Sequence, residues 1–105
     1  FLGLKQASQA ITADGSTTTA VDILAAITEI NATSATHACA MADGADGQVK
    51  TIINVSTSGT NNVVITPANL RGGTTITLNA PGETVTCLFK NSNWNVIAFN
   101  GAVIA

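Results

Sequence analysis

Five short runs rich in β-branched and aromatic residues follow one another through the second half of the chain. They span residues 48–55, 62–66, 74–78, 84–90 and 93–99, and Gly, Asn, Asp, Ser or Pro stand between them. Such runs, bounded in this way, are typical of strands and hairpins. Strand starts fall about every 10 to 12 residues after position 36, as in a β-sandwich or a barrel. The sequence therefore predicts an all-β fold, a small antiparallel β-sandwich or barrel-like domain.

The first third of the chain is less regular. Residues 1–10 are predicted to form an N-terminal arm, and residues 11–105 a single β domain. The stretch 18–30 fits two patterns. Read as a helix, it places Val21 and Leu24 on one face, whereas read as two strands it alternates apolar and polar residues. The threonine run before it and the β-rich sequence around it favour strands.

Charged residues are scarce, since they make up 10% of the chain against a typical value of about 25%. The polar surface must come largely from 16 Thr, 10 Asn and 6 Ser. Small neutral residues suit close-packed protein contacts, which favours an oligomer over a Thr- and Asn-rich extracellular β domain that stays alone. A net charge of −2 with dispersed cations argues against binding to nucleic acid. No apolar run approaches the roughly 20 residues of a membrane helix, so no membrane partner is expected.

Cys39 and Cys87 fit no metal-binding spacing, and both lie in strand-like runs. Buried cysteine commonly packs as a small hydrophobe, so free thiols are favoured over a disulfide or a metal site. His37, the only histidine, shares a strand face with Cys39, as a base beside a nucleophile would. The sequence identifies no third residue that would orient His37 toward Cys39, as a catalytic triad requires. A packed or interfacial histidine is therefore favoured, and no enzymatic activity is predicted.

Two further sets of residues have side chains of the kinds that bind a metal ion or a sugar. The loop 43–47 holds Asp43 and Asp46, whose carboxylates are ligands that calcium prefers, but it lacks the glutamate and the density of acids of an EF-hand. A plain turn is favoured there, and no metal or cofactor is expected. Trp94 and Phe99 lie among Asn and Ser residues and offer an aromatic platform for a sugar, although a core tryptophan is favoured.

The last two predicted strands carry apolar side chains on both faces. Val85 and Phe89 alternate with Leu88 in one strand, and Trp94 and Val96 alternate with Ile97 and Phe99 in the other. Strands of this kind are usually covered on both sides. We expect a second sheet inside and another subunit outside, with Leu88, Ile97 and Phe99 in the subunit interface.

An ordered series of short motifs runs through the last two thirds of the chain. The motifs are residues 43–44, 46–52, 64–67, 73–78, 82–86, 93–94 and 100–102. In order and spacing this series resembles a β-rich domain of virion structural proteins of tailed bacteriophages, particularly those of marine and cyanobacterial hosts. The resemblance covers residues 36–105.

The resemblance implies a non-enzymatic virion part that assembles as a homotrimer. A single small domain with an apolar arm suits a capsid decoration or cement protein on the capsid surface better than a long fibre. Phe1, Leu2 and Leu4 of the arm would then dock on the major capsid protein, by strand addition or by burial, and stabilise the assembled head. The alternative is a receptor- or glycan-binding domain of a phage fibre or tail component, with Trp94 in its site.

Overall fold

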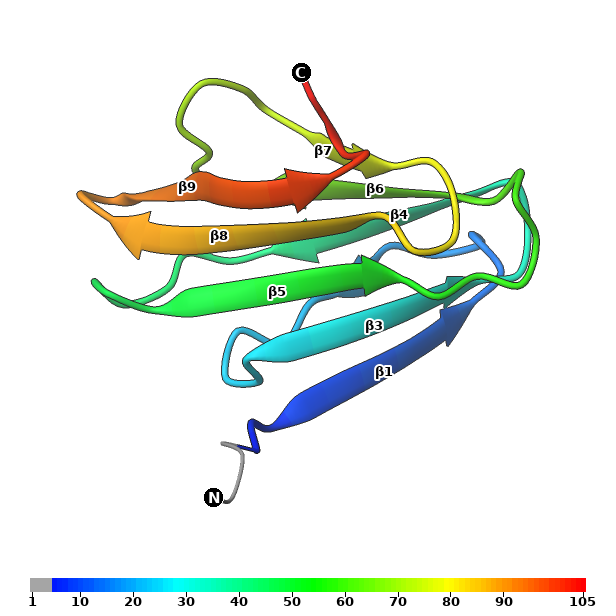
Figure 1. The fold of residues 1–105 in the computed structure, drawn as a ribbon, viewed down its shortest axis with the longest axis horizontal. Helices are drawn as coiled ribbons and strands as arrows, with labels where there is room; N and C mark the ends of the chain where they lie inside the picture. Colours follow the sequence, from blue (N-terminus) through cyan, green and yellow to red (C-terminus); the bar gives the residue numbers. More distant parts are fainter. Residues whose placement is uncertain (1–4) are drawn as a thin grey trace.

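The computed structural model describes residues 5–105, which form ten strands and no helix. Two five-stranded sheets make up the molecule (Figure 1): sheet A in the order β1-β3-β5-β8-β9 and sheet B in the order β10-β7-β6-β4-β2. The strands are β1 (Ser8–Ala13), β2 (Thr19–Ala20), β3 (Ile27–Ala32), β4 (Thr36–Met41), β5 (Val49–Asn54), β6 (Asn62–Pro67), β7 (Ile76–Leu78), β8 (Thr84–Lys90), β9 (Asn93–Asn100) and β10 (Val103–Ile104). The all-β prediction is confirmed. The stretch 18–30 holds no helix, which agrees with the strand interpretation, but strand is limited there to β2 and the start of β3, and residues 21–26 form a turn between them.

The first six strands wind as a coil that alternates between the two sheets. β1, β3 and β5 lie parallel in sheet A, and β2, β4 and β6 lie parallel in sheet B. Each connection in this half therefore crosses from one sheet to the other. The antiparallel pairing predicted from the sequence does not hold here. Alternation with period two buries the same face whether the neighbouring strand runs parallel or antiparallel, so the pattern does not distinguish the two.

The last four strands pair antiparallel and complete both sheets. β8 joins β5 and β9 in sheet A, while β7 joins β6 and β10 in sheet B. β8 and β9 form a hairpin whose two turn residues, Asn91 and Ser92, have φ of 53° and 63°. Positive φ at both residues is the mark of a type I′ turn, whose twist matches that of the flanking strands. The antiparallel prediction thus holds for the second half of the chain.

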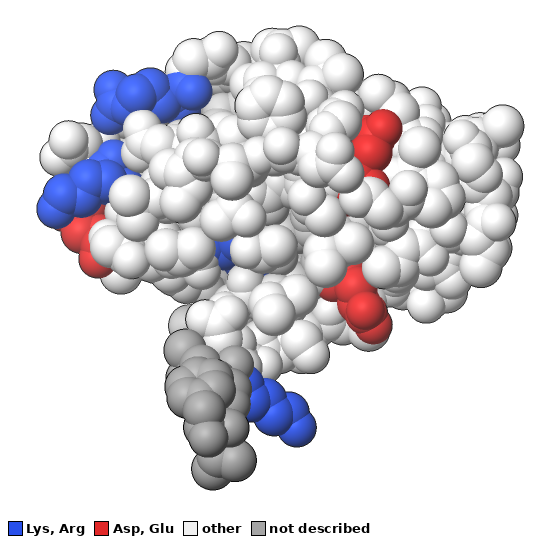
Figure 2. Space-filling model, viewed as in Figure 1, with Lys and Arg blue, Asp and Glu red and all other residues white. Residues whose placement is uncertain are grey.

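Charged side chains lie mainly in the loops. Of the four basic and six acidic residues, Glu29, Lys50 and Lys90 lie in strands. Lys50 is buried in the core, and Lys90 is the last residue of β8. On the face shown in Figure 2, charged side chains form a few separate groups on an otherwise uncharged surface. The broad faces of the two sheets are therefore almost free of charge.

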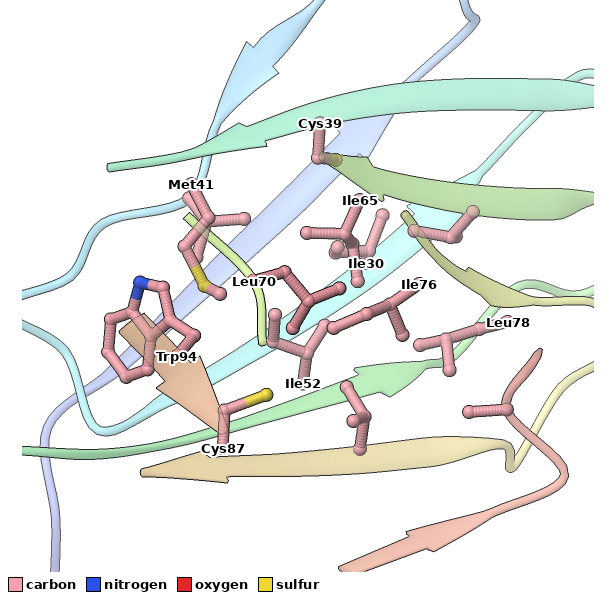
Figure 3. Packing of buried hydrophobic residues seen from close by; sticks show 14 of the residues in the cluster. Ile30, Cys39, Met41, Ile52, Ile65, Leu70, Ile76, Leu78, Cys87 and Trp94 are labelled. Carbon is pink, nitrogen blue, oxygen red and sulfur yellow. The ribbon is translucent and has the colours of Figure 1, made fainter. Parts of the chain in front are cut away.

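The core between the sheets is mainly aliphatic (Figure 3). Sheet A contributes Ile30, Ile52 and Cys87, and sheet B contributes Met41, Ile65, Ile76 and Leu78. Trp94 is also fully buried and packs edge-on against Phe89, with 5.2 Å between the ring centroids. Its indole Nε1 donates to Ala42 O at 2.9 Å, so the buried N–H has the partner it needs.

Amide side chains fasten the connection between β5 and β6. The buried Asn54 donates through Nδ2 to Leu78 O at 3.1 Å, and its Oδ1 accepts from Ser56 N at 2.9 Å. Asn61 Nδ2 donates to Ala32 O at 2.6 Å. These bonds satisfy backbone groups that the crossing leaves without a strand partner. They also tie the connection to β3 in sheet A and to β7 in sheet B.

The predicted arm overlaps the first strand. Residues 8–10 form the first half of β1, so strand pairing begins inside the range 1–10. Phe1, Leu2 and Leu4 lie outside the described residues. Their contact with a capsid stays a prediction.

Candidate interaction surfaces

The outer face of sheet A carries apolar and threonine side chains. Val49, Thr51 and Ile53 alternate along β5 with the buried residues of that strand. The register with β8 places Leu88 opposite Val49 and Thr86 opposite Thr51, and residues directly opposite each other project from the same face of a sheet. The hydroxyls of Thr51 and Thr86 lie 3.0 Å apart. Neutral side chains therefore cover the middle of this face.

The same face continues onto the neighbouring strands. Ile27 of β3 lies opposite Thr51, and Ile97 of β9 follows Val96, which packs against the core. Ile97 is 55% exposed and Val49 is 47% exposed. Two charged residues lie on this side of the sheet: Glu29 of β3, and Lys90 at the end of β8, which pairs with Asp46. We call this surface the sheet A outer face and define it by Ile27, Glu29, Val49, Thr51, Ile53, Thr86, Leu88 and Ile97.

A β-bulge separates the three predicted interface residues. Cys87 pairs with Val96 and Thr86 pairs with Ala98, so Ile97 is the extra residue in β9. Phe99 consequently lies opposite the buried Val85. Leu88 and Ile97 belong to the sheet A outer face, whereas Phe99 projects from the other side of this edge strand and is 61% exposed. The prediction that all three share one face is wrong, because it assumed uninterrupted alternation along β9.

The outer face of sheet B carries mostly small side chains. Ala38 and Ala40 of β4 are exposed, and the register places Val64 and Thr66 of β6 beside them. Thr77 of β7 follows in the same row as Val64. The strands of this sheet contain no Lys, Arg, Asp or Glu within residues 5–105. This face is therefore neutral as well, and it carries one exposed valine, Val103 of β10, which lies opposite Thr77.

His37 and Cys39 both point from β4 into the core. His37 Nε2 lies 2.8 Å from Thr19 Oγ1 in β2. Burial raises the pKa of the Cys39 thiol to about 11, whereas an activated thiol has a lowered pKa. Cys87 is likewise free and buried, and burial raises the pKa of its thiol to about 11. The interpretation of a packed histidine and two free, packed thiols is confirmed.

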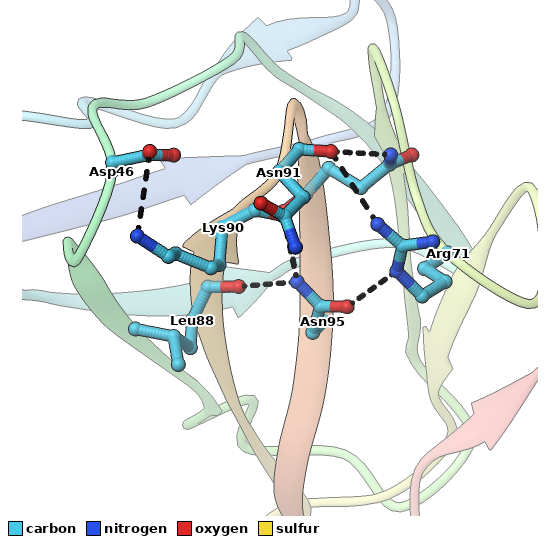
Figure 4. Close-up of polar contacts among 7 residues, drawn as sticks. Asp46, Arg71, Leu88, Lys90, Asn91 and Asn95 are labelled. Carbon is cyan, nitrogen blue, oxygen red and sulfur yellow. Dashed lines mark hydrogen bonds and ion pairs between the residues drawn. The ribbon is translucent and has the colours of Figure 1, made fainter.

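The aspartates of the loop 43–47 contact neighbouring polar side chains. Asp46 Oδ2 lies 3.5 Å from Lys90 Nζ in an exposed ion pair (Figure 4). Asn69 Nδ2 donates to both carboxylate oxygens of Asp43, at 2.9 and 3.1 Å. Across residues 5–105, three or more His, Cys, Asp or Glu side chains nowhere come together as metal ligands would. The contacts fit a turn that is fastened to its neighbours.

The burial of Trp94 changes the interpretation of the aromatic platform. Its side chain has no exposed surface, so its ring is closed to a sugar, and the core-tryptophan interpretation is confirmed. Polar groups nearby fasten a loop instead. Arg71 Nε donates to Asn95 Oδ1 at 2.8 Å (Figure 4), and Arg71 N donates to Trp94 O at 2.9 Å. These bonds hold the loop 68–75 against the start of β9.

Lys50 is a buried polar residue that the sequence did not reveal. Its Nζ donates to Asp22 O at 2.9 Å, to Ala25 O at 2.6 Å and to Thr28 Oγ1 at 2.5 Å. These bonds fix the turn 22–26 against β3 and β5. Burial lowers the pKa of Lys50 to about 8, and the Asp22 carboxylate opposes part of that change. Within an alternating strand a lysine is ordinarily placed on the solvent side, and no neighbouring residue signals otherwise.

Two depressions interrupt the surface. One, of about 430 Å³, is lined by Thr12, Ala13, Asp14, Thr17, Thr19 and Thr33. The other, of about 370 Å³, is lined by Gly73, Thr74, Asn93 and residues 66–70. Threonine hydroxyls line most of the first depression, and Thr19 Oγ1 there lies 2.8 Å from the buried His37 Nε2. The second mixes hydroxyl and amide groups with Pro67, Ala68 and Leu70. The exposed apolar side chains lie on the broad sheet faces and not in these depressions, so we take the sheet faces as the stronger candidates for function.

Residues 5–105 include no helix that is long and apolar enough to cross a membrane.

No protein-family model matches the chain, and no curated protein matches it in sequence.

Proposed function

We propose that this chain is a non-enzymatic virion structural protein, a capsid decoration protein of a tailed bacteriophage that assembles as a trimer. The observation that carries the proposal is the sheet A outer face, which exposes Val49 and Ile97 and has charge at Glu29 and, at its end, at the Lys90 that pairs with Asp46. An exposed, nearly uncharged apolar patch marks a surface for protein contact. The resemblance of residues 36–105 to virion domains supports this kind of assembly.

The broad faces are large enough for a specific interface. The molecule measures 37 × 34 × 23 Å, and a standard interface buries about 800 Å² on each partner. Burial of apolar area contributes roughly 25 cal/mol per Å². Glu29 is the one charged residue among those that define this face, and Lys90 at the end of β8 already pairs with Asp46, so little of that gain is lost to buried charge.

The exposed side chains on the two sides of β9 suit a three-fold arrangement. A ring of three identical subunits needs two different, complementary patches on each subunit. Leu88 and Ile97 lie on the sheet A outer face, while Phe99 projects from the other side of the same edge strand. In the proposed trimer, the first patch of one subunit packs against Phe99 of the next.

The proposed contact with the major capsid protein uses the arm. Phe1, Leu2 and Leu4 would bury their side chains on the shell, and the trimer would bring three such arms to one site. Linked contacts of this kind raise the overall affinity without any new contact type. Each bound trimer then stabilises the assembled shell over free subunits by mass action.

Native mass spectrometry and sedimentation of the full chain test the trimer. We expect a three-fold mass that Ile97→Lys abolishes, since a charge on the sheet A outer face must be desolvated in the interface. Thr66→Lys is the matched control, because it adds the same charge to the exposed outer face of sheet B. A wild-type chain with no three-fold unit, or equal effects of the two lysines, contradicts the proposed interface.

Binding to phage heads tests the decoration role separately. Labelled chain is mixed with purified heads of a phage that encodes it, stripped of this component, and pelleted. We expect co-sedimentation and a raised temperature of head disruption. A chain that trimerises but stays in the supernatant contradicts the capsid role while leaving the trimer intact.

A further inference from the structure

β1 forms an open edge of sheet A. Ala7 O accepts from Ile27 N at 3.3 Å, and Ala13 O accepts from Thr33 N at 2.8 Å, so the odd-numbered residues from 7 to 13 face β3. The backbone N–H and C=O groups of the alternate residues, Ser8, Ala10 and Thr12, therefore point away from β3. No strand of the described chain lies on that side.

This edge lacks the features that usually prevent pairing with another chain. β1 is six residues long, Ser-Gln-Ala-Ile-Thr-Ala, with no proline and no charge, and its register with β3 has no bulge. Proline, lysine and bulges are the common means of blocking an edge strand. The opposite edge differs: β9 contains a bulge, and Leu70 bridges to Trp94 along its outer side. β1 is thus the edge prepared for pairing.

We propose that β1 pairs antiparallel with β1 of a second copy of this chain, across a two-fold axis at Ala10. The outward-facing backbone groups of Ser8, Ala10 and Thr12 would then meet those of Thr12, Ala10 and Ser8 in the second copy. Each such pair exchanges two hydrogen bonds in an antiparallel ladder, which gives about six new bonds. Sheet A becomes continuous over both copies.

Charges at the two ends of β1 select the antiparallel direction. Lys5 precedes the strand, Asp14 follows it, and both side chains are exposed. With Ala10 on the axis, Lys5 of each copy lies opposite Gly15 of the other, next to Asp14. Two attractive pairs result, whereas a parallel arrangement would put like charges together. Exposed ion pairs contribute little to stability, but like charges held together disfavour the wrong register.

Side-chain size also fits the two-fold axis. Ser8, Ala10 and Thr12 are exposed and small or β-branched, so Ala10 meets its own copy without crowding. The inward-facing side chains of β1 already have partners within the same copy. Gln9 Oε1 accepts from Asp22 N at 2.8 Å and from Thr28 Oγ1 at 2.9 Å, and Ile11 is buried in the core. Pairing therefore requires no rearrangement within one copy.

The pairing is independent of the proposed trimer. β1 and β9 lie at opposite edges of sheet A, so the backbone pairing of β1 and the packing around β9 use different strands. In the proposed assembly both contacts occur together, among six copies. The mass of the remaining assembly distinguishes the two contacts. Loss of the β1 contact divides the assembled mass by two, and loss of the β9 contact divides it by three.

The first test compares two lysine variants of the full chain by native mass spectrometry and sedimentation. Ala10→Lys puts two like charges face to face on the axis, and Glu29, which lies opposite Ala10 on β3 in each copy, offsets part of that repulsion. We therefore expect the mass to halve and association through β1 to weaken several-fold. Ala40→Lys is the matched control, since Ala40 is also an exposed strand alanine, in β4 of sheet B, and we expect no change. An assembly that Ala10→Lys leaves intact overturns the pairing, even if it is a trimer.

A second test does not depend on the folding of Ala10→Lys. Lys5→Glu sets like charges beside Asp14 of the other copy and should weaken association several-fold, while Lys5→Glu with Asp14→Lys should restore it. Hydrogen exchange provides a third readout. The amides of Ser8, Ala10 and Thr12 should gain protection between about 10 and 500 µM wild-type chain. Protection that does not change with concentration, or a monomer at the higher concentration, overturns the proposal.

Discussion

At the scale of single residues, Lys50 shows how a small core accommodates a charge. An ammonium group has three N–H donors, and the three acceptors around Lys50 Nζ, at 2.5 to 2.9 Å, use all of them. Two of those acceptors are carbonyl oxygens in the turn 22–26. Lys50 therefore replaces backbone pairing in a turn that has no strand partner, and burial lowers its pKa to about 8 as a consequence.

Lys50 and the two buried thiols give opposite pH dependences. The pKa of Lys50 falls from 10.5 to about 8 on folding, so the unfolded chain binds more protons between these values and stability rises with pH. The thiol pKa values rise from 9.0 to about 11, so stability falls with pH above 9. Because two thiols outweigh one amine, we expect maximal stability near pH 9. One proton of difference changes stability by about 1.4 kcal/mol per pH unit.

Thermal melts between pH 7 and 10.5 check this dependence. Lys50→Met keeps the length of the side chain and removes the titrating group, so the rise between pH 8 and 9 should disappear while the fall above pH 9 remains. The comparison uses the shape of each pH profile and not the absolute melting temperature, which the lost hydrogen bonds also lower. A rise that persists in Lys50→Met contradicts the assignment to this residue.

Trp94 carries a second prediction at this scale. Its ring is fully buried against Phe89, so Trp94→Ala should destabilise the fold by about 3 to 5 kcal/mol through lost burial and a new cavity. Trp94→Phe should cost less, because it keeps an aromatic ring and loses mainly the bond to Ala42 O. Urea unfolding measures both. Equal stabilities of Trp94→Ala and wild type would contradict the buried position.

At the scale of strands, the sequence predicted the elements better than their partners. The runs 84–90 and 62–66 correspond closely to β8 and β6, because turn residues and alternation mark both ends of each. The parallel partners of β3 and β5 were not predictable, since nothing in a strand's own pattern encodes the direction of its neighbour. The strand pattern was likewise insufficient to predict which face of sheet A each exposed side chain occupies. Leu88 and Ile97 share a face as predicted, but one extra residue in β9 places the side chain of Phe99 on the opposite face.

The hairpin between β8 and β9 allows a stabilising substitution. Ser92 has φ of 63°, a conformation that costs an L residue roughly 1 kcal/mol and glycine almost nothing. Ser92→Gly should therefore raise the free energy of unfolding by about 0.5 to 1 kcal/mol, measured in urea, as expected for an Asn-Gly type I′ turn. Gly82→Ala is the converse control: its φ is 87°, and no atom lies within 4 Å of an added Cβ. It should lower stability, and a change of the same sign in both variants contradicts the argument.

At the scale of the whole molecule, charge and hydrophobicity are distributed in a way that favours assembly. The loops carry most of the charged residues, the broad faces are nearly neutral, and one edge of sheet A presents backbone groups without partners. A chain with 10% charged residues keeps little electrostatic repulsion between copies. The proposed contacts remove from solvent the apolar side chains of the sheet A outer face and pair the free backbone groups of the β1 edge with each other.

Combining the two proposed contacts gives the last prediction. The β1 contact and the β9 contact lie at opposite edges of sheet A, so their effects on association should be independent. Ala10→Lys with Ile97→Lys should yield a folded monomer of 10.6 kDa, apart from the small mass of the substitutions. Its melting temperature should not change with concentration, whereas that of the wild type should rise, because association stabilises the folded state. A wild-type melting temperature that is flat over a hundredfold range of concentration contradicts both contacts.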